Sequence, residues 1–131
     1  MKSKSMLFSV VFLVFLDLAG CRSAPVQDIG ATPIKMNKAG YELEDVEKAI
    51  IRAGAKLAWQ MTVERPGFIR GVRTERTHMA DIGITYTTKE YSIRYLDSQN
   101  LDYKAGKIHK AYNAWINRLN DAILLELSIP R

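Results

Sequence analysis

Apolar and polar positions recur with two different periods along this chain, and the periods predict its elements. In residues 41–55 and again in residues 107–127, apolar residues lie three and four positions apart, the spacing of one helix face. The two stripes contain Val46, Ala49, Ile50, Ala53 and Leu57 in the first segment, and Ile108, Ala111, Tyr112, Trp115, Leu119, Ala122 and Ile123 in the second. The sequence therefore predicts two amphipathic helices, the second about 30 Å long.

The region between these helices alternates with the period of two that is typical of strands. We expect four strands, at about residues 57–64, 68–74, 79–86 and 91–96. Pro66-Gly67 suits a tight turn between the first two strands. Apolar residues of the third and fourth strands share one parity, so these strands are expected to bury one common face as an antiparallel pair.

These elements predict an α+β fold in the order α-β-β-β-β-α. Both helices would cover one face of a four-stranded antiparallel meander sheet, giving a two-layer sandwich. Ala49 and Ala53 suggest a close approach of the first helix to the sheet, and Gly54 is its predicted exit. A chain of 131 residues holds one small domain at most, which we place at residues 41–131.

Residues 21–40 keep neither period, which predicts a flexible tether. The segment is rich in residues that interrupt regular structure, namely Pro25, Gly30, Pro33 and Gly40. A coil of about 20 residues spans about 25 Å, so the domain would stand off from whatever holds its N-terminus. The alternative is that residues 34–36 pack onto the domain as an irregular arm.

The first 20 residues have the pattern of a secretory signal peptide. Lys2 and Lys4 precede an almost uninterrupted apolar run at residues 6–16, as in the basic and hydrophobic regions of such signals. The run is shorter than the roughly 20 apolar residues that cross a bilayer. We therefore expect residues 1–20 to be removed, the alternative being an N-terminal membrane helix that stays attached.

This signal ends in Leu18-Ala19-Gly20-Cys21, and Cys21 is the only cysteine in the chain. The four residues resemble the lipobox of bacterial lipoproteins. The resemblance implies cleavage before Cys21, a diacylglyceryl group on its sulfur and usually an acylated amine. In enteric-type lipoproteins an Asp after the cysteine retains the protein in the inner membrane. Arg22 stands at that position, so the implied address is the outer membrane, facing the periplasm.

A second resemblance covers about half of the chain. It is carried by Arg76-Thr-His78-Met-Ala80, Tyr91-Ser-Ile-Arg-Tyr95, Asn100-Leu101-Asp-Tyr103, Ile108-His109 and Tyr112-Asn-Ala-Trp115-Ile116. These stretches are similar to a group of small Gram-negative bacterial lipoproteins to which no activity is assigned. The resemblance implies the same location in the cell envelope and brings with it no substrate or cofactor.

The formal net charge of +5 biases the surface toward anionic neighbours without identifying one. Guanidinium groups bind phosphate and carboxylate groups through two parallel hydrogen bonds. Candidate residues for such an anion-binding site in or beside the strands are Arg70, Arg73, Arg76 and Arg94. Their ligand would be lipopolysaccharide, phospholipid, peptidoglycan or an acidic envelope protein, and the alternative is an ordinary solvated sheet face. Nucleic acid is not an expected partner of an exported protein.

Catalytic and metal chemistry find little support in the residue pattern. Zinc sites need three or four ligands, the chain has two histidines, and its cysteine is assigned to lipid, so we expect no metal and no other cofactor. His78 shares the parity of Ala80, which is typical of a half-buried strand residue. His78 and Asp81 could also form a pair. A small hydrolase that uses His78 with Asp97 or Asp102 is a weaker hypothesis, because no nucleophile motif surrounds Ser92 or Ser98.

These observations together predict a non-enzymatic protein anchored by lipid in the periplasm. It would act as a binding or structural module for another envelope component. The alternative is a module in which the arginines bind an anionic glycolipid or peptidoglycan.

Overall fold

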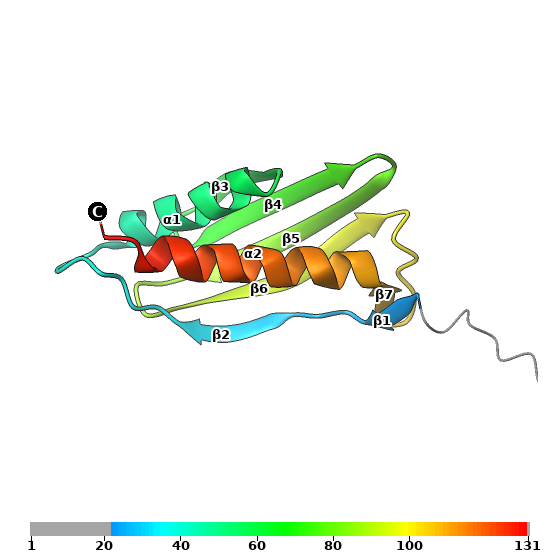
Figure 1. Cartoon of the computed structure of the whole chain (residues 1–131), viewed down its shortest axis with the longest axis horizontal. Helices are drawn as coiled ribbons and strands as arrows, with labels where there is room; N and C mark the ends of the chain where they lie inside the picture. The colour runs from blue at the N-terminus through cyan, green and yellow to red at the C-terminus, as the bar shows by residue number, and fades with distance from the viewer. Residues whose placement is uncertain (1–21, 131) are drawn as a thin grey trace, which may run out of the picture.

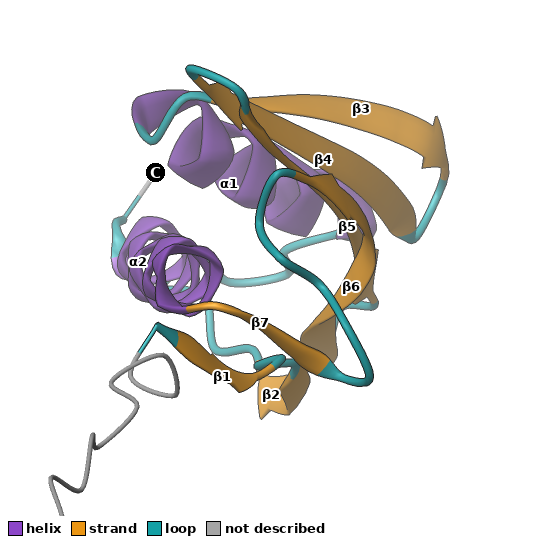
Figure 2. Ribbon diagram, turned by 90° about the vertical axis from the view of Figure 1, so that its right-hand side faces the viewer, coloured by secondary structure: helices purple, strands orange, loops and turns teal. Residues whose placement is uncertain are grey.

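Two helices lie on one face of an antiparallel sheet in the computed structural model, which describes residues 22–130 (Figures 1 and 2). The elements in chain order are β1 (Ser23–Pro25), β2 (Ile29–Pro33), α1 (Leu43–Lys56), β3 (Trp59–Arg65), β4 (Phe68–Glu75), β5 (His78–Tyr86), β6 (Glu90–Gln99), β7 (Lys107–His109) and α2 (Lys110–Ser128). The predicted signal peptide and its Leu18-Ala19-Gly20-Cys21 ending lie outside the described residues. The α+β class predicted from the sequence is confirmed.

The main sheet has five strands in the order β2-β6-β5-β4-β3, so the predicted four-stranded sheet is wrong by one strand. Strands β3 to β6 form the expected meander, with every neighbouring pair antiparallel. Ile69, Ile84 and Ile93 lie opposite one another across three strands and are fully buried. This row confirms the apolar parity predicted for the third and fourth strands.

Residues 23–25 and 29–33 form paired strands, which corrects the predicted tether. Strand β2 adds to the main sheet beside β6, and β1 pairs with β7 in a separate two-stranded sheet. Both strands lie at sheet edges, where a proline such as Pro25 or Pro33 is tolerated because one side of the strand needs no backbone donor. Ile34 is buried and Met36 packs against the core, so the alternative of a packed arm is confirmed.

Polar bonds from α2 hold the connection between β1 and β2. Asn113 accepts a hydrogen bond from the backbone N–H of Gln27 at 3.0 Å and donates one to the carbonyl of Pro25 at 2.9 Å. The side chain of Gln27 donates to Asn117 one helical turn further along, at 2.6 Å. The connection is therefore held at Pro25 and at Gln27 by a helix more than 80 residues away in the chain.

The first helix begins and packs largely as its sequence predicts. Asp45 accepts a hydrogen bond from the backbone N–H of Glu42 at 2.8 Å, and this bond, followed by the ion pair with Lys38, lowers the pKa of Asp45. Ala49 and Ala53 are fully buried. Gly54 does not end the helix, which continues to Lys56. It lies against Met61 of β3 instead, where a Cβ atom would collide with the methionine side chain.

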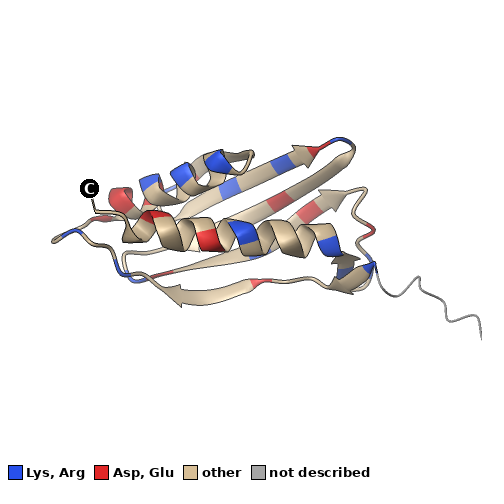
Figure 3. Ribbon diagram, viewed as in Figure 1, with Lys and Arg blue, Asp and Glu red and all other residues tan. Residues whose placement is uncertain are grey.

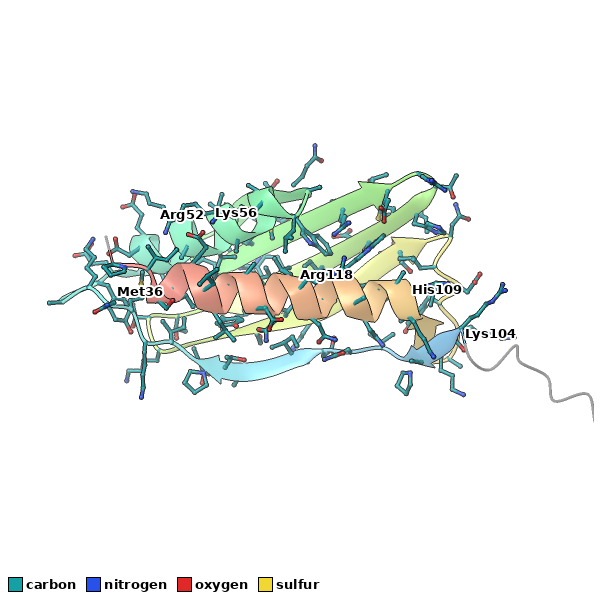
Figure 4. The ribbon with its side chains drawn as sticks, in the orientation of Figure 1. Met36, Arg52, Lys56, Lys104, His109 and Arg118 are labelled. Atoms are coloured by element: carbon teal, nitrogen blue, oxygen red, sulfur yellow. The ribbon has the colours of Figure 1, made fainter. Side chains whose placement is uncertain are left out.

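The second helix begins at Lys110, three residues later than its apolar stripe suggests, because residues 107–109 form β7. His109 caps this helix, since its Nδ1 accepts a hydrogen bond from the N–H of Ala111 at 3.0 Å. Near its other end, Glu126 is almost fully buried and pairs with Arg52 at 2.9 Å and with Lys56, both from α1. Figure 4 shows Arg52 and Lys56 on α1 beside α2.

Candidate functional site

Two of the four candidate arginines lie on the face of the sheet that carries no helix. Arg70 and Arg94 flank Gly83 on β5 from the neighbouring strands. The guanidinium of Arg70 makes a two-point ion pair with Asp81, whose carboxylate is buried, through an Nε–Oδ1 bond of 2.9 Å and a second bond from Nη2. The hydrogen bonds with Asp81 raise the pKa of Arg70. An internal carboxylate therefore already occupies the binding fork of Arg70.

Arg73 lies on the opposite face, beneath α2. Its guanidinium stacks 4.5 Å from the ring centre of Trp115, and Trp59 is its cross-strand neighbour. Its side chain is 14% exposed, and Nη2 approaches the carboxylate of Glu75 at 3.9 Å. Among the described residues, the Nε atom of Arg73 and the indole N–H of Trp59 have no hydrogen-bond partner. Arg73 is therefore part of the interface between the sheet and α2.

Arg76, the fourth candidate, lies in the turn between β4 and β5, where its backbone adopts the left-handed region with φ of 55°. The structure thus places the four arginines on two faces and in a turn. They do not form one surface. The alternation in β4 predicts the separation of Arg70 from Arg73, because Arg73 shares the parity of the buried Ile69 and Arg70 has the other parity.

The possible pair of His78 and Asp81 is not formed. His78 is half-buried, as its parity predicts, and its Nδ1 donates to the carbonyl of Asn100 at 2.6 Å. Asp81 pairs with Arg70 on the other face of the sheet. The imidazole of His78 lies instead over that of His109, with ring centres 6.5 Å apart.

Basic residues outside the four candidate arginines form a cluster where α2 begins. We call Arg22, Lys104, Lys107 and Lys110 the basic end, and all four are exposed. Figure 3 shows basic residues at this end of the ribbon, and Figure 4 labels Lys104 close to His109 there. A cavity of about 430 Å³ is lined by three of these residues and three neighbours, which are Arg22, Ser23, Asp102, Lys104, Ala105 and Lys107.

Backbone bonds bring the basic end together. Lys104 and Lys107 exchange both N–H···O bonds, at 2.9 and 3.0 Å, around the two-residue turn Ala105-Gly106. Both turn residues have positive φ, 50° and 75°, which is the requirement of a type I′ hairpin. The carbonyl of Arg22 accepts a hydrogen bond from the backbone N–H of Lys110 at 3.0 Å. The chain is thus fixed to the domain from Arg22 onward.

The three lysines were visible in the sequence at a spacing of three, around a glycine that suits a turn. Their proximity to Arg22 was not visible, because it arises from the pairing of β1 with β7, whose residues are more than 80 positions apart. Each of these strands is only three residues long, too short to show a period.

Within residues 22–130, no group of three or more potential metal-ligating side chains gathers in one place. Neither helix of this range is both long enough and apolar enough to cross a membrane. Comparison of the chain with protein-family models, with curated proteins and with solved structures found no match.

Proposed function

We propose that this chain is a lipid-anchored protein of the bacterial envelope that acts, without catalysis, by binding another envelope component. The observation that carries the proposal is the lipobox Leu18-Ala19-Gly20-Cys21, which follows a basic and then apolar leader. It is supported by the position of Arg22, the first residue that the structure describes. Arg22 is bonded to α2, so a lipid on Cys21 would be attached directly to the folded domain.

The proposed address is the outer membrane, with the domain facing the periplasm. Arg22 stands where enteric-type lipoproteins of the inner membrane carry Asp. The absence of internal disulfides, since the chain has a single cysteine, fits a thiol that is consumed by acylation.

A single arginine patch for anionic glycolipid or peptidoglycan is not proposed. Arg70 is neutralised by Asp81 and Arg73 stacks on Trp115 beneath the helix. Such a patch would need at least these two side chains on one accessible surface.

Metabolic labelling with a palmitate analogue tests the anchor in cells that express the full chain. We expect label on the wild type and none on Cys21→Ser, with the wild-type chain about 20 residues shorter than its precursor by mass. An unlabelled wild type, or equal label on both proteins, would refute the proposal.

The address is tested by separating inner and outer membranes on a density gradient. We expect the wild type in the outer-membrane fractions and Arg22→Asp in the inner-membrane fractions. Recovery of the wild type with the inner membrane would contradict the proposed location while leaving the anchor in place.

The binding role is tested by crosslinking the lipoprotein in intact cells and then purifying it from solubilised membranes. We expect one envelope component to copurify in a defined ratio. An uncrosslinked lipoprotein across the range of crosslinker concentrations would contradict a binding role.

A further inference from the structure

We propose that the basic end lies directly against the anionic phospholipid headgroups of the membrane that holds the anchor, so that the domain rests on the bilayer instead of standing off from it. This inference rests on the proposed function, because a lipid on Cys21 decides which end of the domain is nearest to the membrane. It adds an orientation, a second contact and a class of ligand, the phosphate of an anionic phospholipid.

The short distance between Cys21 and the folded domain limits how far the domain can stand from the membrane. Consecutive Cα atoms are about 3.8 Å apart, so Cys21 cannot lie further than this from Arg22. The carbonyl of Arg22 is bonded to Lys110 at the first residue of α2, and β1 begins at Ser23. The headgroup region on each side of a bilayer is roughly 5–7 Å thick. A lipid-bearing Cys21 therefore brings Arg22 and the start of α2 to the depth of the headgroups.

The basic end also carries the charge that an anionic membrane surface attracts. The basic end presents Arg22, Lys104, Lys107 and Lys110, and one acidic residue, Asp102, lines the cavity among them. A Lys or Arg near an anionic bilayer surface strengthens binding about fivefold. The side chains can therefore add an electrostatic contact to the hydrophobic one.

The shape of this end agrees with such a contact. The cavity of about 430 Å³ opens between Arg22 and the hairpin of Lys104 and Lys107, and this volume lies in the range of small-ligand pockets. Tyr103, which lies between Asp102 and Lys104 in the chain, is 49% exposed and stacks on Tyr95 with ring centres 4.5 Å apart. Tyrosine is enriched at the level of the headgroups in membrane proteins. A phosphate in the cavity would meet three cationic side chains.

The test uses the acylated lipoprotein, reconstituted in vesicles of phosphatidylethanolamine with phosphatidylglycerol or in vesicles of phosphatidylcholine alone. Amide hydrogen exchange is followed by mass spectrometry in peptides that cover residues 101–107. We expect at least about fivefold slower exchange of these peptides in the anionic vesicles. The protection should disappear at about 1 M salt, where screening acts over about 3 Å.

Charge variants identify the surface that makes the contact. Lys104→Glu with Lys107→Glu should abolish the protection of residues 101–107 in anionic vesicles. Lys35→Glu with Lys89→Glu makes the same change in charge at two exposed residues near the far end of α2, where Ile34 bonds to Lys89, and should leave the protection intact. If the first pair of substitutions lowers the melting temperature, Lys104→Gln with Lys107→Gln replaces it.

The two proposals fail in distinguishable ways. Equal exchange in both kinds of vesicle, with Cys21 shown by mass to carry its lipid, would overturn the membrane contact and leave the anchored protein standing. Loss of protection with the control pair and not with the hairpin pair would also overturn it. An unmodified Cys21 in the same preparation would refute the proposed function itself.

Discussion

Arg73 and Arg70 are three residues apart and meet different environments because alternate strand residues face opposite sides of the sheet. Arg70 satisfies its charge with the carboxylate of Asp81. The guanidinium of Arg73 lies against the ring of Trp115, and its Nε atom has no hydrogen-bond partner among the described residues. A partly unsatisfied cation in an apolar interface contributes little net stability, because its desolvation offsets its contacts.

Replacing Arg73 by Met should therefore change the free energy of unfolding by less than about 1.5 kcal/mol, as conservative swaps of similar volume do. Trp115→Ala should lower it by about 3–5 kcal/mol, because it leaves a cavity above the sheet. Urea denaturation followed by circular dichroism measures both values. A larger loss from Arg73→Met than from Trp115→Ala would show that the charge of Arg73 dominates this contact.

Glu126 is a residue whose ionisation should couple to stability. Hydrogen bonds from Lys56 and then from Arg52 lower its pKa below the reference value of 4.5. A carboxyl group whose pKa is lower in the folded state stabilises the fold above the unfolded pKa. This stability is lost as the pH falls through the folded value.

We therefore expect the free energy of unfolding to fall as the pH is lowered from 4.5, and Glu126→Gln to flatten part of this dependence. At neutral pH the substitution should cost about 1–3 kcal/mol, because the neutral amide offers one acceptor oxygen to two cations that now share two. Asp121→Asn removes an exposed carboxylate from the same helix and serves as the control. Chemical denaturation at several pH values between 3 and 7 measures the effect. Equal slopes for the wild type and Glu126→Gln would contradict it.

Short elements illustrate why the predicted tether was wrong. Strands β1 and β7 have three residues each and contain no alternation to recognise. Pro25, Gly30 and Pro33 are typical of loops, yet all three lie in edge strands, where fewer backbone bonds are required. The longer elements α1, α2 and β3 to β6 have enough residues to show their period, and the sequence predicts each of them.

Two hydrogen bonds of Asn113 hold the connection between β1 and β2 against α2, and their contribution to stability can be measured. Asn113→Ala removes both bonds to Pro25 and Gln27, so we expect a loss of about 1–3 kcal/mol and faster exchange of the Gln27 amide. Asn117→Ala removes one exposed bond to the side chain of Gln27 and should cost about 1 kcal/mol or less. Denaturation and amide exchange by NMR measure the two effects. An equal loss of stability in both variants would contradict the expectation that Asn113 holds this connection more strongly than Asn117 does.

In the whole molecule, the segment of residues 22–34 belongs to the same folded unit as the core. The amide of Val26 donates to the carbonyl of Gly106 at 2.9 Å, and that of Ile34 donates to the carbonyl of Lys89 at 2.8 Å. Ile34 also joins the buried core. The domain is therefore larger at its N-terminal side than the predicted residues 41–131.

We expect the Ile34 amide to exchange through global unfolding, with an opening free energy within about 1 kcal/mol of that of core amides on β5. A flexible tether would show no protection at this position. Native-state hydrogen exchange by NMR at increasing denaturant distinguishes the two cases. Exchange of Ile34 that is insensitive to denaturant would show that the segment opens locally.

The sequence by itself determined the helices and the four central strands with their buried faces, because each has a period that its own residues display. Residues 18–21 also form a local pattern that resembles a lipobox, and such a pattern can be recognised without the fold. The tertiary structure alone decided the three short strands, the stacking of Arg73 on Trp115 beneath α2, and the meeting of Arg22 with the lysines around Gly106. The physical reason is that the short strands and the basic end depend on hydrogen bonds and packing between residues more than 50 positions apart in the chain, where no local period exists to reveal the partner.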